Sequence, residues 1–271
     1  MSKFAIGLLI CLGATALSAK PLIIGHRGAS AYAPENTVES QQLAWDLNAD
    51  GAEFDVYLTA DKKLMVLHDK DTSRTANGAI NLNIKKSVST ELEKVDVGAW
   101  KDKTFEGVTL PYLSDMFACH PKGKKLVIEI KDQPDTVPGV KDLIENSGRP
   151  LDEFVVISFN LDTCVEARKL MPKATVYFLE SANDNPEKKV KDFTEDILKI
   201  AKDNNFNGVN LDYRGVTPQL VEKAKAMGLD ILVWTVDKKE DVERMAKMGV
   251  DAITTNRPDT TRRYVDEALG K

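Results

Sequence analysis

Short apolar runs rich in β-branched residues alternate along this chain with longer segments in which apolar residues recur every three to four positions. The runs are typical of buried strands, and the periodic segments are typical of amphipathic helices. The predicted strands are 22–25, 52–56, 64–67, 126–131, 154–159, 175–179, 208–211, 231–236 and 252–255. Their alternation with helices predicts β-α-β units and a parallel sheet.

The helical pattern is clearest in the second half of the chain. The predicted helices are 163–170, 194–204, 218–227 and 239–248. Gly228 and Gly249 directly follow the last two, at the position where glycine commonly ends a helix.

The number of strands leaves the topology open. The chain has 271 residues, which suits one α/β barrel or two smaller domains. Nine predicted strands exceed the eight places of a barrel, so one is misassigned or lies outside it. The link from Asp55 to Leu64 is too short for a helix, but about seven extended residues span roughly 23 Å and could restart a parallel strand. The alternative is a hairpin, which we expect to carry His68 away from His26.

The alternation breaks between residues 70 and 121, where the chain becomes polar and contains Trp100, Phe105 and Tyr112. This stretch predicts an insertion after the third strand. Excursions at strand ends shape the active-site mouth of a barrel, so this one is placed to hold a substrate's alcohol group.

Residues 1–19 have the pattern of a secretory signal peptide, with Lys3, an apolar segment at 4–17, and small residues at Ser18 and Ala19. The apolar segment is too short to span a bilayer as a helix. We predict cleavage after Ser18 or Ala19, export to a bacterial periplasm, and no stable membrane insertion afterwards.

The net charge bears on the possible binding partners, and the cysteine content bears on disulfide formation. The net charge of −5 argues against a nucleic-acid partner, because no basic stripe is present to neutralise phosphates. Beyond the signal segment the cysteines are Cys119 and Cys164, at opposite ends of neighbouring predicted helices. We expect both to be free thiols. The sequence does not determine the oligomeric state.

Ionisable residues gather where predicted strands end. These residues are His26, Glu53, Asp55, His68, Glu129 and Lys131. Residues two apart on a strand leave the same face, so Glu53 and Asp55 point together. The carboxyl ends of the strands form the catalytic face of a barrel. The third histidine, His120, precedes Pro121 far from this group, and we expect it to be structural or solvent-exposed.

This residue set suits metal-assisted attack on a phosphate ester. Carboxylates without His or Cys ligands favour a hard divalent cation, Mg²⁺ or Ca²⁺. Two histidines then remain for proton transfer, and Arg27 and Lys131 can contact phosphate oxygens.

The motifs around these residues resemble those of a known family. They are His26-Arg27-Gly28, Pro34-Glu35-Asn36-Thr37, Glu53-Phe54-Asp55, His68-Asp69, Glu129-Ile130-Lys131, Ser158-Phe159 and Trp234-Thr235-Val236. Together they resemble the glycerophosphodiester phosphodiesterases over residues 22–258. The resemblance implies a single TIM (β/α)8 barrel domain over 20–271, with an insertion after the third strand, and hydrolysis of glycerophosphodiesters to glycerol 3-phosphate and an alcohol.

The resemblance also implies roles for single residues. By the family pattern the acid/base pair is His26 and His68, the metal ligands are Glu53, Asp55 and Glu129, the phosphate contacts are Arg27 and Lys131, and the glycerol pocket is walled by Phe159 and Trp234. For Phe159, a role in core packing has equal weight with the role in the glycerol pocket.

Two positions depart from the family pattern. Asp237 stands where many relatives have Asn, and Asn256 stands where Asp is common. Neither is a predicted ligand, so we expect them to affect substrate choice more than catalysis.

Two other functions remain open. A barrel acting on lysophospholipids should have an apolar rim, whereas the insertion is mostly polar. A non-catalytic binding protein should lack a histidine or a carboxylate of the set, and none is missing. No Gly-x-Ser-x-Gly, His-Glu-x-x-His or Walker motif occurs in the sequence.

Overall fold

The computed structural model describes residues 20–131, 133–182 and 190–270. The predicted signal peptide at 1–19 lies outside the described residues. Within the described part of the chain, no helix is both long enough and apolar enough to cross a bilayer.

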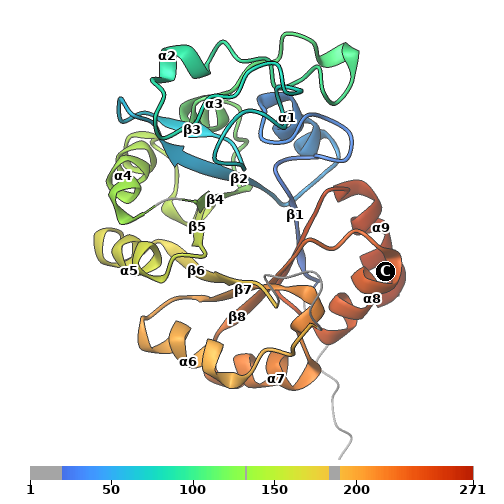
Figure 1. Ribbon diagram of the computed structural model, residues 1–271. Coiled ribbons are helices and arrows are strands. Elements are labelled where there is room, and N and C mark those ends of the chain that lie inside the picture. The colour runs from blue at the N-terminus through green and yellow to red at the C-terminus, as the bar shows by residue number, and fades with distance from the viewer. Residues whose placement is uncertain (1–19, 132, 183–189, 271) are drawn as a thin grey trace, which may run out of the picture.

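Strands of the described chain form one sheet that closes on itself (Figure 1). They are β1 (Leu22–Gly25), β2 (Gly51–Leu58), β3 (Leu64–Val66), β4 (Lys125–Ile130), β5 (Phe154–Ser158), β6 (Thr175–Glu180), β7 (Gly208–Asp212), β8 (Asp230–Trp234) and β9 (Ala252–Thr255). β1 pairs in parallel with both β2 and β9, which closes the ring. The other neighbouring strands of the ring are also parallel. The predicted TIM barrel is confirmed.

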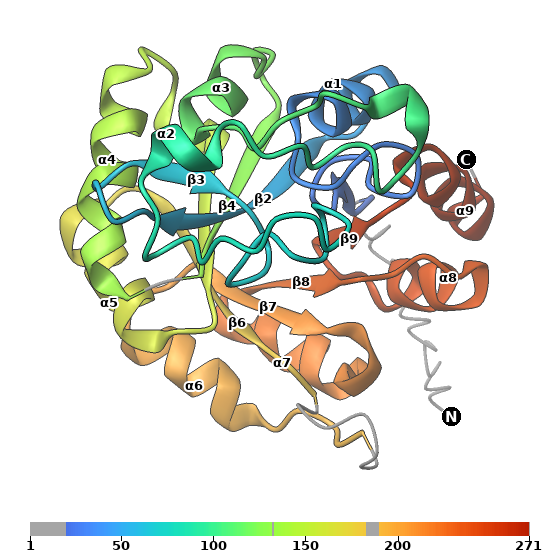
Figure 2. The ribbon, with the colours of Figure 1, turned by 45° about the horizontal axis from the view of Figure 1, so that its top comes forward.

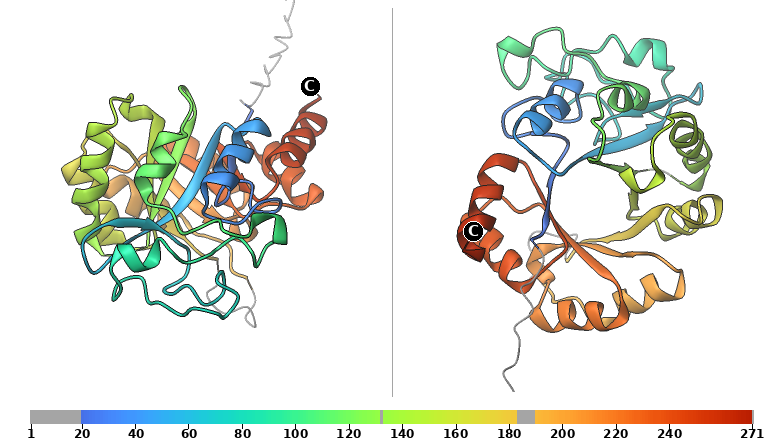
Figure 3. Two further views of the ribbon diagram at one scale, coloured as in Figure 1. Left: turned by 90° about the horizontal axis from the view of Figure 1, so that it is seen from above. Right: turned by 180° about the vertical axis from the view of Figure 1, so that it is seen from behind.

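Helices cover the outside of the ring (Figures 1 and 3). The helices of the described chain are α1 (Val38–Asp46), α2 (Ser89–Leu92), α3 (Leu113–Ala118), α4 (Val137–Asn146), α5 (Leu161–Leu170), α6 (Glu195–Asp203), α7 (Pro218–Met227), α8 (Lys239–Met248) and α9 (Pro258–Leu269), with short 3-10 helices η1 (Lys103–Phe105), η2 (Pro134–Thr136), η3 (Leu151–Glu153) and η4 (Tyr213–Gly215). Of these, α2 and η1 belong to the insertion and not to the outer layer of the ring. Gly228 and Gly249 end α7 and α8 with φ of 69° and 76°. This left-handed conformation is easily adopted by glycine, and it confirms both predicted helix ends.

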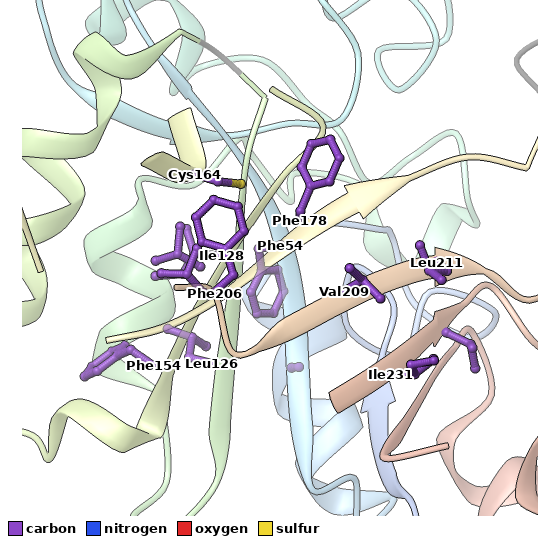
Figure 4. Close-up of a cluster of buried hydrophobic side chains, with 14 of the residues drawn as sticks. Phe54, Leu126, Ile128, Phe154, Cys164, Phe178, Phe206, Val209, Leu211 and Ile231 are labelled. Atoms are coloured by element: carbon purple, nitrogen blue, oxygen red, sulfur yellow. The ribbon is translucent and has the colours of Figure 1, made fainter. Parts of the chain in front are cut away.

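The period-two alternation of the strands divides the core into two layers. One layer packs between strands and helices and includes Phe54, Ile128 and Val209 (Figure 4). The other fills the barrel interior and includes Val127 and Leu232. Because Phe54 faces the helices, its neighbours Glu53 and Asp55 face the interior.

β3 is the strand that does not belong to the ring. It pairs antiparallel with β2, with Val56 opposite Val66, so the two form a hairpin. The hairpin does not carry His68 away as we expected. β2 runs past its last pairing with β4 at Val56 before the chain turns back, and the Leu67 amide donates to the Asp55 carbonyl at 3.0 Å. The returning chain therefore brings His68 back to the mouth of the barrel.

The insertion after β3 has a small apolar core of its own. Buried members of this core include Met65 on β3 and Ile84, Leu92 and Val97 in the insertion. Figure 2 shows α2 and its connecting segments lying across β2 and β3. The insertion is thus anchored to the hairpin beside the barrel mouth.

Cys119 and Cys164 are both free thiols, as predicted.

Candidate active site

Three carboxylates converge at the carboxyl ends of β2 and β4. Glu53 and Asp55 lie on β2, and Glu129 is the register partner of Asp55 on β4. One oxygen from each of the three lies within 4.8 Å of the others, and all three side chains are buried. Neighbouring parallel strands thus place the predicted ligands at one point.

The turn after β1 is shaped by its contacts with these acids. Arg27 adopts a φ of 54°, which is uncommon outside glycine. Its amide donates to Glu53 Oε2 at 2.9 Å, and its carbonyl accepts from the Asn36 amide at 3.0 Å. Gly28 follows with a φ of 82°, and a Cβ there would lie 2.4 Å from Ser40 Oγ. The turn needs glycine at this position, which explains part of the His26-Arg27-Gly28 motif.

Asp55 is held ionised by its neighbours. Asn36 Nδ2 donates to Asp55 Oδ2 at 2.8 Å, and Lys131 Nζ lies 3.3 Å from Asp55 Oδ1. Arg27 Nε lies 3.4 Å from Asp55 Oδ2. Burial opposes the charged form, but the Lys131 and Arg27 charges outweigh it and hold the pKa of Asp55 well below its usual range.

Glu53 and Glu129 have the opposite electrostatic environment. Burial, and then the charges of Asp55 and Glu129, raises the pKa of Glu53 well above its usual range. Burial and the Asp55 charge raise the pKa of Glu129 to about 7. Glu53 Oε1 is buried without a hydrogen-bond partner in the described chain. Crowded carboxylates with an unused oxygen fit a divalent cation, whose charge would satisfy them.

His26 is oriented by an amide. Its Nδ1 lies 2.8 Å from Asn256 Oδ1, and Asn256 Nδ2 donates to Asp237 Oδ2 at 2.5 Å. Since the amide nitrogen is engaged by Asp237, the amide oxygen faces His26, so Nδ1 carries the hydrogen and Nε2 has the free lone pair. Burial, with the Arg27 charge, lowers the pKa of His26 to about 4.

His68 is oriented by a carboxylate instead. Its Nδ1 lies 2.7 Å from Asp69 Oδ1, and Arg74 Nε donates to Asp69 Oδ2 at 2.6 Å. Arg74 also donates to both carboxylate oxygens of Glu35, at 2.9 and 2.7 Å. The pKa of His68 is lowered by burial, and the Asp55 charge opposes this.

A cavity of about 150 Å³, called here the inner cavity, opens between these groups. Phe159 and Trp234 meet edge to face at its wall, with ring centres 5.6 Å apart. Phe159 is 44 % exposed, so it is not a core residue. All predicted site residues except Asp55 line this cavity: His26, Arg27, Glu53, His68, Glu129, Lys131, Phe159 and Trp234. Asp55 does not line the cavity itself, but it contacts Lys131 and Arg27, which do.

His120 lies apart from the site. It is buried next to Trp45 and Phe154, and its Nε2 is 2.9 Å from the Lys124 carbonyl, just before β4 begins.

Sequence reasoning assigned no role to the residues that support the site. Asn36 and Glu35 belong to the motif Pro34-Glu35-Asn36-Thr37. No local sequence pattern shows that Asn36 binds Asp55 or that Glu35 binds Arg27 and Arg74. Asp237 and Asn256 were noted only as departures from the family pattern. Asn256 contacts His26, 230 positions away, and Asp237 holds Asn256; no local pattern reveals either contact.

Comparison with known proteins agrees with this geometry. The model of the glycerophosphoryl diester phosphodiesterase family matches residues 26–260. A glycerophosphodiester phosphodiesterase of Caldanaerobacter subterraneus subsp. tengcongensis is 34 % identical over 245 residues, covering 89 % of this chain and 96 % of that protein.

Solved structures show the same fold. One of a glycerophosphodiester phosphodiesterase from Parabacteroides distasonis superposes with a TM-score of 0.74 and 29 % identity, over 92 % of this chain and 98 % of that one. The structure of an Oleispira antarctica phosphodiesterase, solved with sn-glycerol-3-phosphate, superposes with a TM-score of 0.80 and 24 % identity. The match covers 91 % of this chain and 97 % of that one. The chain is a TIM-barrel protein with an acidic site at the strand ends. It belongs to the glycerophosphoryl diester phosphodiesterase family.

Proposed function

We propose that this protein hydrolyses glycerophosphodiesters to glycerol 3-phosphate and an alcohol, with a divalent cation held by Glu53, Asp55 and Glu129. The observation that carries the proposal is the buried cluster of these three acids beside a cavity that two differently oriented histidines line. The Parabacteroides relative, named for this activity, and the product bound by the Oleispira enzyme support it.

The cation is Mg²⁺ or Ca²⁺ in this proposal, because all three ligands are carboxylate oxygens. Bound there, it would offset negative charge that develops on the phosphate oxygens. Arg27 and Lys131, which line the same cavity, would contact the non-bridging oxygens.

Each histidine takes the proton-transfer role that the group at its Nδ1 favours. His26, neutral and with a free Nε2, accepts the proton of the attacking hydroxyl. His68, whose Nδ1 faces a carboxylate, is the one suited to carry a proton and give it to the leaving alcohol oxygen. The attacking hydroxyl belongs either to water or to the substrate's own glycerol, in which case a cyclic phosphate forms first.

The glycerol arm occupies the inner cavity in this proposal. Trp234 and Phe159 supply a flat apolar wall for its carbon backbone. Trp234 is fixed by its Nε1, which donates to the Asn210 carbonyl at 3.3 Å.

We also propose that the chain is exported to a bacterial periplasm and loses residues 1–18 or 1–19. The support is the uninterrupted apolar segment behind Lys3 and the small residues that follow it. Mass spectrometry of the protein from a periplasmic extract would test both points by giving the first residue of the mature chain.

The reaction is tested by glycerol 3-phosphate release from glycerophosphocholine, glycerophosphoethanolamine and glycerophosphoinositol. Each is measured after chelation and again with Mg²⁺ or Ca²⁺ restored. We expect release that depends on the cation. No release with the cation present would turn attention to lysolipids or to a binding role.

The histidine roles are tested by His26→Ala and His68→Ala. Each should lower turnover by roughly 10²–10⁴-fold, the usual contribution of one positioned acid or base. Lys199→Ala serves as the control, because Lys199 is 60 % exposed on α6, away from the cavity. Wild-type turnover in either histidine variant would refute its role.

A further inference from the structure

A second cavity, of about 440 Å³, lies on the other side of His26 and Arg27, and is called here the outer cavity. The insertion contributes Trp100 and Lys101 to its lining, and the segments after β8 and β9 contribute Asp237 and Arg257. His26 and Arg27 line both cavities.

This arrangement matches the shape of a phosphodiester, in which two ester arms extend from one phosphorus atom. The phosphate must sit between the cation ligands and the histidines if the proposed function holds. With the glycerol arm in the inner cavity, Arg27 and both histidines stand at the phosphate. The leaving oxygen then stays at the phosphate beside His68, and the rest of the second arm would extend past Arg27 into the outer cavity.

The acids at the outer cavity are already engaged by the protein. Glu35 Oε1 is 2.8 Å from Arg27 Nη1 and 2.7 Å from Arg74 Nη2. Asp237 accepts from Thr255 Oγ1 at 2.8 Å and from the Asn256 amide and side chain at 2.8 and 2.5 Å. Glu35 is thus paired with two cations, whereas Asp237 accepts hydrogen bonds only from neutral groups of the protein.

Two cations at the same cavity have no carboxylate partner. Lys101 Nζ donates to the Ser30 carbonyl at 2.7 Å, and Arg257 lies over the Tyr32 ring at 5.6 Å. Within the described residues, neither one forms an ion pair. Burial lowers the pKa of Lys101, the nearby charge of Arg257 adds to this, and Glu35 opposes it. The N-terminus of α9, directly after Arg257, adds positive potential.

Trp100 does not offer a free aromatic surface for a cationic alcohol. Arg74 Cζ and Lys101 Nζ already lie 5.9 and 5.8 Å from its ring centre. A quaternary ammonium would have to join two protein cations at the same ring, which like-charge repulsion disfavours.

We infer that the outer cavity binds the alcohol arm of the substrate and selects alcohols that carry an anionic group, a carboxylate or a phosphate, through Lys101 and Arg257. This inference rests on the proposed function. It names two specificity-determining residues outside the predicted catalytic and metal-binding set.

The test compares glycerophosphoserine with glycerophosphoethanolamine, whose alcohols differ by one carboxylate. With the cation-loaded enzyme we expect kcat/KM to favour the serine ester by roughly tenfold, as one charge-assisted hydrogen bond would produce. The preference should weaken as ionic strength rises, since the outer cavity is open to solvent.

Arg257→Gln is the main variant, because the Arg257 side chain makes no cap hydrogen bond to α9. It should bring the serine-to-ethanolamine ratio close to one, Arg257→Lys should keep most of it, and Lys101→Gln should lower it as well. Arg263→Gln is the matched control, since Arg263 is 64 % exposed on the same helix and does not line the cavity. Its ratio should equal that of the wild type.

The outcomes distinguish the anionic specificity from the proposed function. Hydrolysis of both esters with equal efficiency, or an unchanged ratio in Arg257→Gln, would overturn the anionic specificity and leave the proposed function standing. Hydrolysis of neither ester, with no release from glycerophosphocholine or glycerophosphoinositol either, would overturn both.

Discussion

His26 and His68 show how the partner of a residue can decide its chemistry. His26 faces a neutral amide that Asp237 holds in one orientation, whereas His68 faces the carboxylate of Asp69. A carboxylate favours a cationic imidazole more than an amide does. In the proposed reaction, the same residue type therefore serves opposite proton transfers at two sides of one cavity.

Exchanging the two residues behind His26 tests this reasoning. In the double variant Asp237→Asn/Asn256→Asp, a carboxylate replaces the amide at His26 Nδ1 and raises the pKa of His26. A base must be neutral to act, so the acidic limb of the kcat/KM profile should move to higher pH, by about one unit or more.

Asp237→Asn alone is the control for the exchange. It weakens the orientation of Asn256 without placing a charge on His26, so kcat should fall while the acidic limb stays in place. An unchanged pH profile in the double variant would show that Asn256 does not act through His26.

The β2–β3 hairpin and the insertion form one packed unit beside the barrel mouth. The hairpin returns the chain to the barrel mouth, and the insertion core then packs on the face of β3 through Met65. Apolar burial at that contact holds Trp100 and Lys101 beside the site. Loosening the insertion should therefore affect substrate binding before it affects the barrel.

Two isoleucines of the insertion provide a matched pair for this prediction. Ile84 is fully buried and Ile80 is 42 % exposed. Ile84→Ala should destabilise the insertion by about 2–5 kcal/mol, as large-to-small changes in a core do, while Ile80→Ala should have little effect.

Limited proteolysis between residues 70 and 112 measures the difference directly. The Ile84 variant should be cut faster and show a raised KM, with little change in the circular dichroism of the barrel. Equal cleavage rates of the two variants would contradict an independently packed insertion.

At the scale of the whole molecule, the acid cluster couples stability to pH and to the cation. Folded Glu129 has its pKa raised from 4.5 to about 7 by burial and by Asp55. At Glu129 the metal-free folded protein therefore holds more protons than the unfolded chain in this range, whereas His26, whose pKa falls from 6.5 to about 4, acts in the opposite direction. The contribution of Glu129 to the free energy of unfolding must fall as the pH rises from about 4.5 to 7.

After chelation, the Tm of the wild type measured relative to that of Glu129→Gln should accordingly be lower at pH 8 than at pH 5. At pH 8, Mg²⁺ or Ca²⁺ at a hundredfold excess over its Kd should add about 2.7 kcal/mol. For a chain of this size that corresponds to a Tm increase of roughly 5–10 °C. Glu53→Gln should largely remove the increase, and a full increase in that variant would show that the cation binds elsewhere.

The sequence by itself determined the succession of strands and helices, the helix ends at Gly228 and Gly249, and the gathering of acids and histidines at strand ends. These features depend on residues close in the chain, where periodicity and glycine conformation act. The tertiary structure alone decided that β3 turns back as a hairpin, that Asn256 orients His26, and that two cavities meet at Arg27. Each of these depends on the register and packing of distant segments, which local preferences do not specify.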